Sequence, residues 1–344
     1  MEKMDLTKKN IFITGVAGFI GSNLAKKLCN IFPNINLIGI DNMNNYYDTD
    51  LKKYRLNELL KYKNFKFFKG NIADKIMVNK VFNDYKPNIV VNLAAQAGVR
   101  YSITNPDAYL ESNLIGFFNI LEACRYNRVE HLVYASSSSV YGMNKKIPYS
   151  TEDKVDNPVS LYAATKKSNE LMAHAYSKLY DIPSTGLRFF TVYGPAGRPD
   201  MAYFGFTNKL IKNEKIQIFN YGNCKRDFTY IDDIITGIVN VMEKIPDKNE
   251  NGIRYKIYNI GNNKPENLLD FVDILQQELI SAGVLPKNYD FEAHKELVPM
   301  QPGDVEMTYA DVNDLIKDFN FKPKTSLRDG LRNFAKWYKE FYLK

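Results

Sequence analysis

The stretch TGVAGFIGSNL, residues 14–24, decides the fold, because its three glycines follow an apolar run and open an amphipathic one. Upstream, NIFIT (10–14) is a short apolar run of β type. Downstream, FIGSNLAKKLCNIF (19–32) has apolar residues at helical spacing. The pattern predicts a strand, a tight turn and a helix, with the turn built on Gly15, Gly18 and Gly21.

The same alternation continues through the first half of the chain. Apolar runs predict strands at residues 36–41, 65–70, 88–94, 131–137 and 185–190. The stretches between them predict helices at residues 74–86, 107–126 and 161–180. Strands that alternate with helices form a parallel sheet covered on both faces, and near-continuous apolar strands are typical of such sheets.

The alternation of strands and helices ends after about residue 188, where Gly, Pro and polar residues gather in TVYGPAGRPDM (191–201). YKIYNIG (255–261) predicts a return to the sheet, and helices are expected at residues 203–213, 267–282, 311–318 and 327–341. We therefore predict an α/β fold, a doubly wound parallel Rossmann sheet with a smaller, interleaved C-terminal substrate domain. The nucleotide-binding domain is expected at residues 1–187 and about 229–262, and the substrate domain at residues 188–228 and 263–344.

The composition is that of an ordinary globular protein, with 45% hydrophobic and 25% charged residues. The net charge of +7 comes from scattered lysines, without the basic and aromatic platform that binds nucleic acid. The N-terminus MEKMDLTKKN is too polar for a signal peptide, and IVVNLAAQAGV (89–99) is too short for a membrane span. Three isolated cysteines and three histidines offer no metal cluster, so we expect a cytoplasmic protein with reduced cysteines and no metal.

The glycine turn suits a dinucleotide, because a backbone without side chains can approach a pyrophosphate at the N-terminus of a helix. Asp41 ends the second predicted strand, 20 residues after Gly21. A carboxylate there accepts hydrogen bonds from ribose hydroxyls and repels a 2′-phosphate, which favours NAD over NADP. A glycine turn that serves packing alone is the alternative interpretation.

The GxxGxxG spacing resembles that of the short-chain dehydrogenase/reductase superfamily, in its extended branch of nucleotide-sugar epimerases and dehydratases. Further segments match in order, at GNI (70–72), LAAQA (93–97) and SNLIG (112–116). Asn71 stands where the family more often has Asp, and its amide can still pair with adenine. The resemblance implies NAD contacts at Gly15, Gly18, Phe19, Ile20, Gly21, Asp41, Asn42, Asn71, Ile72, Leu93, Ala94, Ala95, Ala97, Asn113, Tyr162, Lys166 and Tyr193.

Tyr162 and Lys166 are four residues apart in SLYAATKKSNE (160–170) and share one face of a predicted helix. A nearby ammonium favours the phenolate, so we expect Lys166 to lower the pKa of Tyr162 and make it a base near neutral pH. Many helices carry such a pair, but this one follows the serine-rich strand. The resemblance implies that Tyr162 is the catalytic acid/base and that Lys166 also binds the nicotinamide ribose.

Four consecutive serines in ASSSSVYG (135–142) discriminate between reactions. The resemblance implies that Ser137 hydrogen-bonds the substrate hydroxyl that loses its proton. At the next two positions the related 4,6-dehydratases carry an Asp-Glu pair, and the decarboxylases keep a Glu at the second, whereas this chain has Ser138 and Ser139. Without a carboxylate to move protons at C5 and C6, hydride transfer at C4 remains, and an epimerase needs only that.

Hydroxyl groups also suit a substrate carboxylate, which an Asp or Glu at these positions would repel. An arginine fork matches a carboxylate in the same way. The candidates for holding this carboxylate are Ser138, Ser139, Thr191, Arg198 and Arg100. For both arginines, an ordinary surface position is the alternative interpretation.

The strings AGVRYS, YASSSSVYG and TVYGPAGRPDM together closely resemble the UDP-glucuronate 4-epimerase family, and the resemblance covers nearly the whole chain. It implies that the uridine diphosphate is held by Arg226 of RDF and by Asp304 of QPGD. Gln301 stands where many relatives have Arg, so we expect one phosphate contact to be weaker or moved.

The resemblance implies an isomerase that interconverts UDP-glucuronate and UDP-galacturonate with a tightly bound, recycled NAD, and it implies a homodimer built on the helices at 107–126 and 161–180. The nearest alternative is a UDP-glucose/UDP-galactose 4-epimerase. A UDP-glucuronate decarboxylase or a sugar-nucleotide dehydratase is disfavoured by the missing carboxylates. A catalytically inactive binding protein would have no reason to keep Ser137, Tyr162 and Lys166 together.

Overall fold

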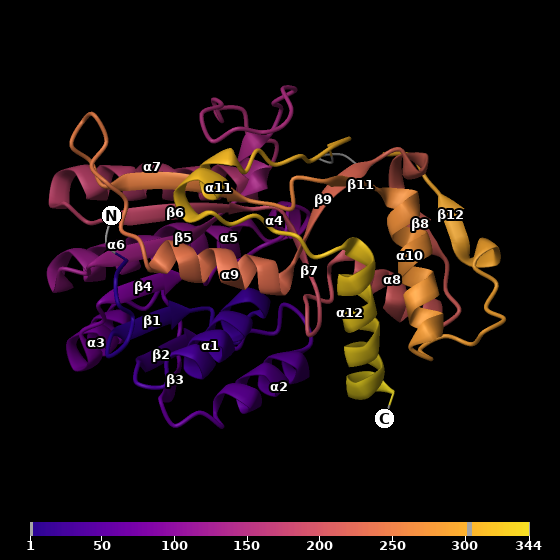
Figure 1. The fold of residues 1–344 in the computed structure, drawn as a ribbon, viewed down its shortest axis with the longest axis horizontal. Helices are drawn as coiled ribbons and strands as arrows, with labels where there is room; N and C mark the ends of the chain where they lie inside the picture. Colours follow the sequence, from indigo (N-terminus) through magenta and orange to yellow (C-terminus); the bar gives the residue numbers. More distant parts are fainter. Residues whose placement is uncertain (1–2, 301–304, 344) are drawn as a thin grey trace.

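The computed structural model describes residues 3–300 and 305–343, and its centre is a seven-stranded, fully parallel sheet. The strand order is β10-β6-β5-β4-β1-β2-β3, so the chain turns in opposite directions on the two sides of β1 (Figure 1). The strands are β1 (Asn10–Thr14), β2 (Asn36–Asp41), β3 (Phe65–Lys69), β4 (Ile89–Asn92), β5 (His131–Ser137), β6 (Ser184–Phe189) and β10 (Tyr255–Ile260). The predicted doubly wound Rossmann sheet is confirmed, including the late return of the chain in β10.

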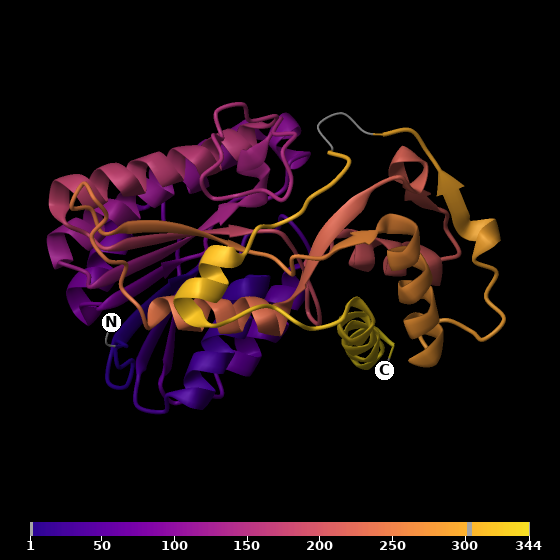
Figure 2. The same cartoon turned by 45° about the horizontal axis from the view of Figure 1, so that its top comes forward.

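Helices cover both faces of this sheet (Figure 2). Successive side chains of a strand point to opposite faces, and in β1 the side chains of Ile11 and Ile13 join one apolar core while Phe12 joins the other. The first core is covered by α1 (Phe19–Ile31), α2 (Thr49–Leu59), α9 (Ile231–Met242) and α11 (Asn313–Phe319). The second is covered by α3 (Lys75–Tyr85), α6 (Gly116–Asn127) and α7 (Leu161–Tyr180).

The connection from β4 to β5 is less regular than its sequence predicts. The expected helix at 107–126 consists of α5 (Pro106–Tyr109), a π-helical turn (Leu110–Ile115) and α6, and α4 (Tyr101–Thr104) precedes them. A π-helical turn inside an α-helix is rare and often marks a functional site. This one contains Asn113, which the sequence assigns to the cofactor site.

A second lobe lies beyond the carboxyl ends of the strands (Figure 1). It contains a three-stranded sheet in the order β11-β9-β7 and a two-stranded sheet of β12 and β8. Its strands are β7 (Thr191–Tyr193), β8 (Ile216–Ile218), β9 (Lys225–Tyr230), β11 (Pro265–Asn267) and β12 (Lys295–Leu297). Its helices are α8 (Ala202–Ile211), α10 (Leu268–Ser281) and α12 (Leu327–Tyr342), all close to their expected positions.

Besides the one-turn α4, the longer helices α2 and α9 of the described chain have no counterpart among the expected helices. In α2 the residues turned inward include Lys52 and Arg55, so the apolar periodicity that marks a helix is broken. The helix α11 was expected in the substrate domain, but it packs against β10 of the large sheet. There Tyr258 Oη donates to Asp318 at 2.6 Å. The predicted division into two domains stays a prediction. Within segment 263–344 the chain packs against the large sheet through α11 and then returns to the second lobe with α12.

Candidate active site

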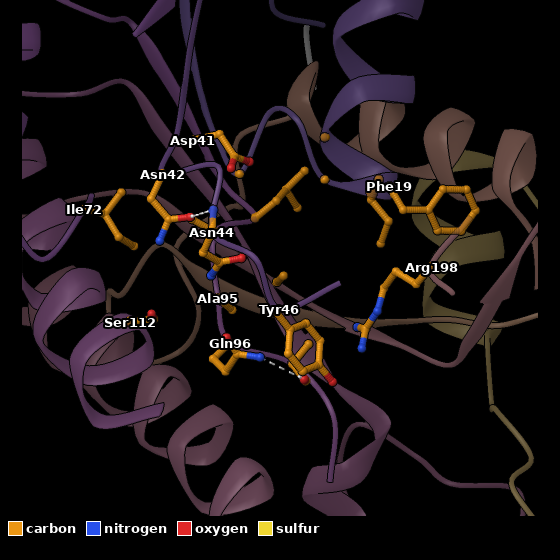
Figure 3. A pocket seen from close by; sticks show the side chains of 18 of the residues that line it. Phe19, Asp41, Asn42, Asn44, Tyr46, Ile72, Ala95, Gln96, Ser112 and Arg198 are labelled. Carbon is orange, nitrogen blue, oxygen red and sulfur yellow. Dashed lines mark hydrogen bonds between the residues drawn. The ribbon is translucent and has the colours of Figure 1, made fainter. Parts of the chain in front are cut away.

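A cleft opens at the carboxyl ends of β1, β2, β4 and β5, beside the point where the strand order reverses (Figure 3). Ligands of open α/β sheets bind at such a point. The predicted catalytic residues Ser137, Tyr162 and Lys166 all line the cleft. The predicted cofactor residues line it as well, with two exceptions, Asn113 and Tyr193.

The glycine turn forms a bare backbone cradle in this cleft. Gly15 has a φ of +69°, and a Cβ placed on it would lie 2.8 Å from the backbone nitrogen of Ala94. A Cβ on Gly18 would lie 2.9 Å from the Gly15 carbonyl oxygen, and one on Gly21 would collide with the same oxygen. Because Gly18 is also the N-cap of α1, a phosphate can approach the free N–H groups of this helix, as the pyrophosphate of NAD requires.

Asp41 closes the cofactor end of the cleft. Its carboxylate accepts from the backbone N–H of Ala17 at 3.1 Å and from that of Met43 at 2.9 Å. The glycine turn and the loop after β2 therefore both hold it in place. The segment after β2 also lines the cleft, although its sequence did not predict this: the loop supplies Asn44, Tyr46 and Tyr47, and α2 supplies Lys52. They went unrecognised because their segment shows neither a glycine motif nor helical periodicity.

Asn113 shapes the cleft from behind. Its side chain is 1% exposed, accepts from the backbone N–H of Gln96 at 2.8 Å, and donates to the Gln96 carbonyl at 3.0 Å. It also donates to Thr165 Oγ1 at 3.0 Å, and Thr165 lies beside Lys166 on α7. Asn113 therefore fixes the loop after β4 against the helix that carries the tyrosine and the lysine.

Tyr193, by contrast, lies away from the cleft. Its ring packs edge-on against Tyr203, Phe228 and Tyr230, and its hydroxyl donates to the carbonyl of Ser326 at 3.2 Å. It joins β7 to the start of α12 and does not line the cleft.

Burial dominates the ionisation of the tyrosine and the lysine. It raises the pKa of Tyr162 above its ordinary value, while a hydrogen bond with Ser137 and the charge of Arg198 act in the opposite direction. Burial also lowers the pKa of Lys166 to about 8, and Lys166 Nζ donates to the carbonyl of Ala135 at 2.8 Å. The expectation that Lys166 lowers the pKa of Tyr162 is therefore not met, and the groups that favour the phenolate are Ser137 and Arg198.

A buried ion pair supports the catalytic strand and helix. Arg188 of β6 donates through Nε and Nη2 to the two carboxylate oxygens of Glu170 on α7, at 2.8 and 2.9 Å, and both side chains are 2% exposed. Ser136 Oγ of β5 donates to the same carboxylate at 2.6 Å. This network explains one of the four serines, since Ser136 joins β5 to α7 and leaves Ser137 at the cleft.

Arg198 is the one predicted carboxylate-binding residue that lines the cleft. Its Nε and Nη2 donate to the carboxylate of Asp200 at 3.0 and 2.5 Å, and Tyr46 Oη donates to the same carboxylate at 3.2 Å. Figure 3 shows Tyr46 and Arg198 approaching each other across the cleft. Asp200 thus holds the guanidinium in one orientation.

The remaining substrate candidates that the structure describes are not among the residues lining the cleft. Ser138 and Ser139 form the 3₁₀ turn directly after β5, and Thr191 begins β7. The Arg100 guanidinium lies 5.2 Å from the ring centre of Phe219. Arg226 of β9 donates to the carbonyls of Lys225 and Glu306, at 3.0 and 3.1 Å, while Gln301 and Asp304 fall outside the described residues.

Residues 3–300 and 305–343 contain neither a metal-binding cluster nor a membrane-spanning helix. Among them no group of three or more His, Cys, Asp or Glu side chains could hold a metal ion. No helix in this part of the chain is long and apolar enough to cross a membrane. The three cysteines are buried and form no disulfide.

Comparison with known proteins gives relatives over almost the full length of the chain. It is 51% identical to the protein CapI of Staphylococcus aureus, over 97% of this chain and 99% of that protein. It is 42% identical to UDP-glucuronate 4-epimerase 4 of Arabidopsis thaliana, over 96% of this chain and 76% of that protein.

Solved structures agree with these sequence relatives. The UDP-glucuronic acid 4-epimerase of Bacillus cereus, in complex with UDP-glucuronic acid and NAD, matches with a TM-score of 0.85 at 32% identity. The match covers 97% of this chain and 100% of that one. A UDP-glucose 4-epimerase of Thermotoga maritima with UDP-glucose matches with a TM-score of 0.82 at 28% identity, over 96% and 99% of the two chains.

A family model described as the NAD dependent epimerase/dehydratase family matches residues 11–261, which run from β1 to the end of β10. This match contains the glycine cradle, Asp41 and the serine, tyrosine and lysine of the cleft. The extended-branch resemblance in the sequence is thereby confirmed, and the chain belongs to the NAD-dependent epimerase/dehydratase family, in the group of the UDP-glucuronate 4-epimerases.

Proposed function

We propose that this protein is an isomerase that interconverts UDP-glucuronate and UDP-galacturonate by epimerisation at C4. The observation that carries the proposal is the cleft itself, which Ser137, Tyr162 and Arg198 line together, with Ser137 and Arg198 both acting on Tyr162. The 3₁₀ turn after β5 supplies Ser138 and Ser139 where elimination or decarboxylation would need an acid. The names of the relatives support the same activity.

The residues of the cleft fit NAD. The glycine turn would hold the pyrophosphate, Asp41 the ribose hydroxyls of the adenosine, Asn71 the adenine and Lys166 the nicotinamide ribose. When bound, NAD accepts a hydride from one face of C4 and returns it to the other face of the 4-keto sugar. No external oxidant or reductant is needed, because the cofactor ends in the state in which it began.

Tyr162 is the acid/base in this proposal. Its phenolate takes the proton of the sugar's O4 while C4 is oxidised, and its hydroxyl returns that proton while C4 is reduced. Burial opposes the phenolate, and Ser137 and Arg198 favour it, so both residues assist the first step. Ser137 also donates a hydrogen bond to O4 at the same point.

The carboxylate of the substrate has to be restrained, because oxidation at C4 makes a β-keto acid that loses CO2 readily. Arg198 is oriented for this task by Asp200, and a planar guanidinium binds a carboxylate through two parallel hydrogen bonds. We propose that Ser138, Ser139 and Thr191 assist from the edge of the cleft. For the uridine diphosphate we propose Arg226, together with Gln301 and Asp304, which lie outside the described residues.

The deciding experiment incubates the purified protein with UDP-glucuronate, without added cofactor, and follows the sugar by proton NMR. Growth of a UDP-galacturonate signal is expected, and it would also show that NAD is carried and recycled. UDP-xylose or a 4-keto pentose would contradict the role given to Arg198. No change, with turnover of UDP-glucose instead, would favour a UDP-glucose 4-epimerase, the activity of the similar Thermotoga maritima protein.

We also propose a homodimer that works in the cytoplasm. The neighbouring helices α6 and α7 expose large apolar side chains to solvent, among them Phe118 at 42%, Leu171 at 59% and Leu179 at 68%. Exposed apolar patches of this kind mark interaction surfaces. A second copy would bury them, because a twofold axis brings the same two helices of each protomer together.

A further inference from the structure

We propose that Arg55 is a positioning residue that fixes the loop carrying Arg198 against the glycine turn. Arg55 lies in α2 and is 3% exposed. Its Nη1 donates to the carbonyl of Ala17 at 3.1 Å. Its Nε and Nη2 donate to the carbonyl of Ala196 at 2.9 and 2.7 Å, and Nη2 also donates to that of Gly197 at 2.8 Å.

The chemistry of the guanidinium explains why an arginine is needed. Arginine presents five N–H donors in a rigid plane, so it can hold several carbonyls at fixed angles at once. A fourth acceptor, Tyr47 Oη at 2.7 Å, comes from the loop after β2. Arg55 therefore joins three segments that surround the cleft, whereas a lysine has one compact ammonium on a flexible stem and cannot span them.

The loop that Arg55 holds has a backbone that needs support. Ala196 has a φ of +51°, a region that side chains other than glycine rarely adopt. A Cβ on Gly197 would collide with the hydroxyl of Tyr203, so this turn is packed tightly. Arg198 follows directly, and its guanidinium reaches the cleft only while the turn keeps this shape.

The same side chain fixes the cofactor cradle. Ala17 precedes Gly18, the N-cap of α1, so the hydrogen bond from Arg55 to the Ala17 carbonyl orients the turn that would receive the pyrophosphate. One guanidinium thus sets the distance between the anion cradle and Arg198. The inference has two consequences, and only the second rests on the proposed function.

The first consequence is that NAD affinity depends on Arg55 in the absence of any sugar. The second is that the share of decarboxylated product rises when Arg55 is changed, because the loop of Arg198 is then released. A residue that only filled the core would lower the melting temperature and change neither quantity.

The experiment compares Arg55→Lys, Arg55→Ala and Tyr47→Phe with the wild type. Arg254→Lys is the matched control for the exchange, because Arg254 is an exposed arginine that contacts Asp181 at 3.5 Å, away from the cleft. NAD is removed from each protein and titrated back by isothermal calorimetry. The products from UDP-glucuronate are then separated, and UDP-pentose is measured as a fraction of UDP-galacturonate.

For Arg55→Lys we expect about tenfold weaker NAD binding, because one or two hydrogen bonds to a charged group are lost. We also expect a raised UDP-pentose fraction. Tyr47→Phe should weaken NAD binding less, because it removes one acceptor and leaves both loops held. Guanidinium ion should restore part of the NAD affinity of Arg55→Ala and none of that of Arg55→Lys, whose ammonium fills the site.

Arg55→Lys with the NAD affinity and product ratio of Arg254→Lys would overturn the inference, whatever its melting temperature. If the wild type leaves UDP-glucuronate unchanged, the proposed function fails, and the NAD titration still decides the role of Arg55. If Arg55→Ala does not fold, Arg55→Lys and Tyr47→Phe decide it.

Discussion

Lys166 is buried, and its pKa of about 8 lies below the ordinary value of 10.5. Because the unfolded chain binds the proton more tightly, the free energy of unfolding rises with pH between these two values. Below pH 8 the folded protein carries the full penalty of a buried ammonium, roughly 3 kcal/mol. Lys166→Met should therefore be more stable than the wild type at pH 7, with a gain that shrinks towards pH 10.5, and should be inactive.

Urea unfolding at pH 7 and pH 10 checks this prediction. Lys178→Met, an exposed exchange on the same helix, is the control for the added methionine. A Lys166→Met protein that is less stable than the wild type at pH 7 would show that the lysine supports the fold.

Arg198 gives a second prediction at the level of single residues. Arg198→Ala should raise the KM for UDP-glucuronate and increase the UDP-pentose by-product, because the carboxylate loses its guanidinium partner. Arg254→Ala is the control, since Arg254 contacts Asp181 and does not line the cleft. The KM is measured by a coupled assay and the by-product by NMR. Wild-type values for both would contradict a role of Arg198 in binding the substrate carboxylate.

Residues with a motif could be predicted from the sequence, and residues without one could not. The glycines, Asp41, Ser137, Tyr162, Lys166 and Arg198 were predicted and line the cleft. Tyr46, Lys52 and Arg55 belong to a segment without apolar periodicity. Tyr46 contacts Asp200 and Arg55 contacts Ala196, each more than 100 residues away along the chain. The direction of the Tyr162 pKa depends on burial, which spacing along a helix does not reveal.

The helix α7 and the strands β5 and β6 are joined by Glu170 and Arg188. Glu170→Gln should destabilise the protein by about 3 kcal/mol, because it leaves a buried guanidinium without its charge partner. The double variant Glu170→Gln, Arg188→Met should recover much of that loss. Denaturation by urea measures both, and a Glu170→Gln protein as stable as the wild type would contradict the importance of the pair.

Helices and strands whose apolar residues repeat at regular spacing were predicted well, and those whose shape depends on contacts distant in sequence were not. The strands of the large sheet and α7 lie close to their predicted positions, whereas the short strands of the second lobe, such as β8 and β11, were not predicted. The expected helix 107–126 is interrupted by a π-helical turn that contains Asn113, whose partner Gln96 lies 17 residues earlier. Local propensity carries no sign of such a contact.

For the whole molecule, the apolar surface of α6 and α7 predicts a dimer in solution. Leu171→Lys with Leu179→Lys should give a folded monomer, because two charges would enter the buried interface. Ile76→Lys on α3 is the control, since Ile76 is 82% exposed and lies on another helix. Light scattering after size exclusion measures the mass, and a wild-type monomer or a double variant that stays dimeric would contradict the proposal.

The doubly wound, parallel arrangement of the large sheet could be predicted because β-α alternation leaves few topologies. The path of the last 80 residues could not, because α11 returns to β10 through contacts such as that of Tyr258 with Asp318. Such a return has no motif, and only the folded chain reveals it.

The π-helical turn at Leu110–Ile115 affects how the chain tolerates a change of length. Such a turn holds about one residue more than an α-helical turn. If one residue were removed, the turn could become α-helical while α5 and α6 kept the same sides turned towards the core. A deletion of one residue there would leave Tyr109 on the Gly98 carbonyl and Asn119 on the Ile72 carbonyl. Asn113, however, would leave its place between Gln96 and Thr165. A one-codon deletion there is therefore expected to leave the surrounding scaffold folded and to release the loop after β4 from α7.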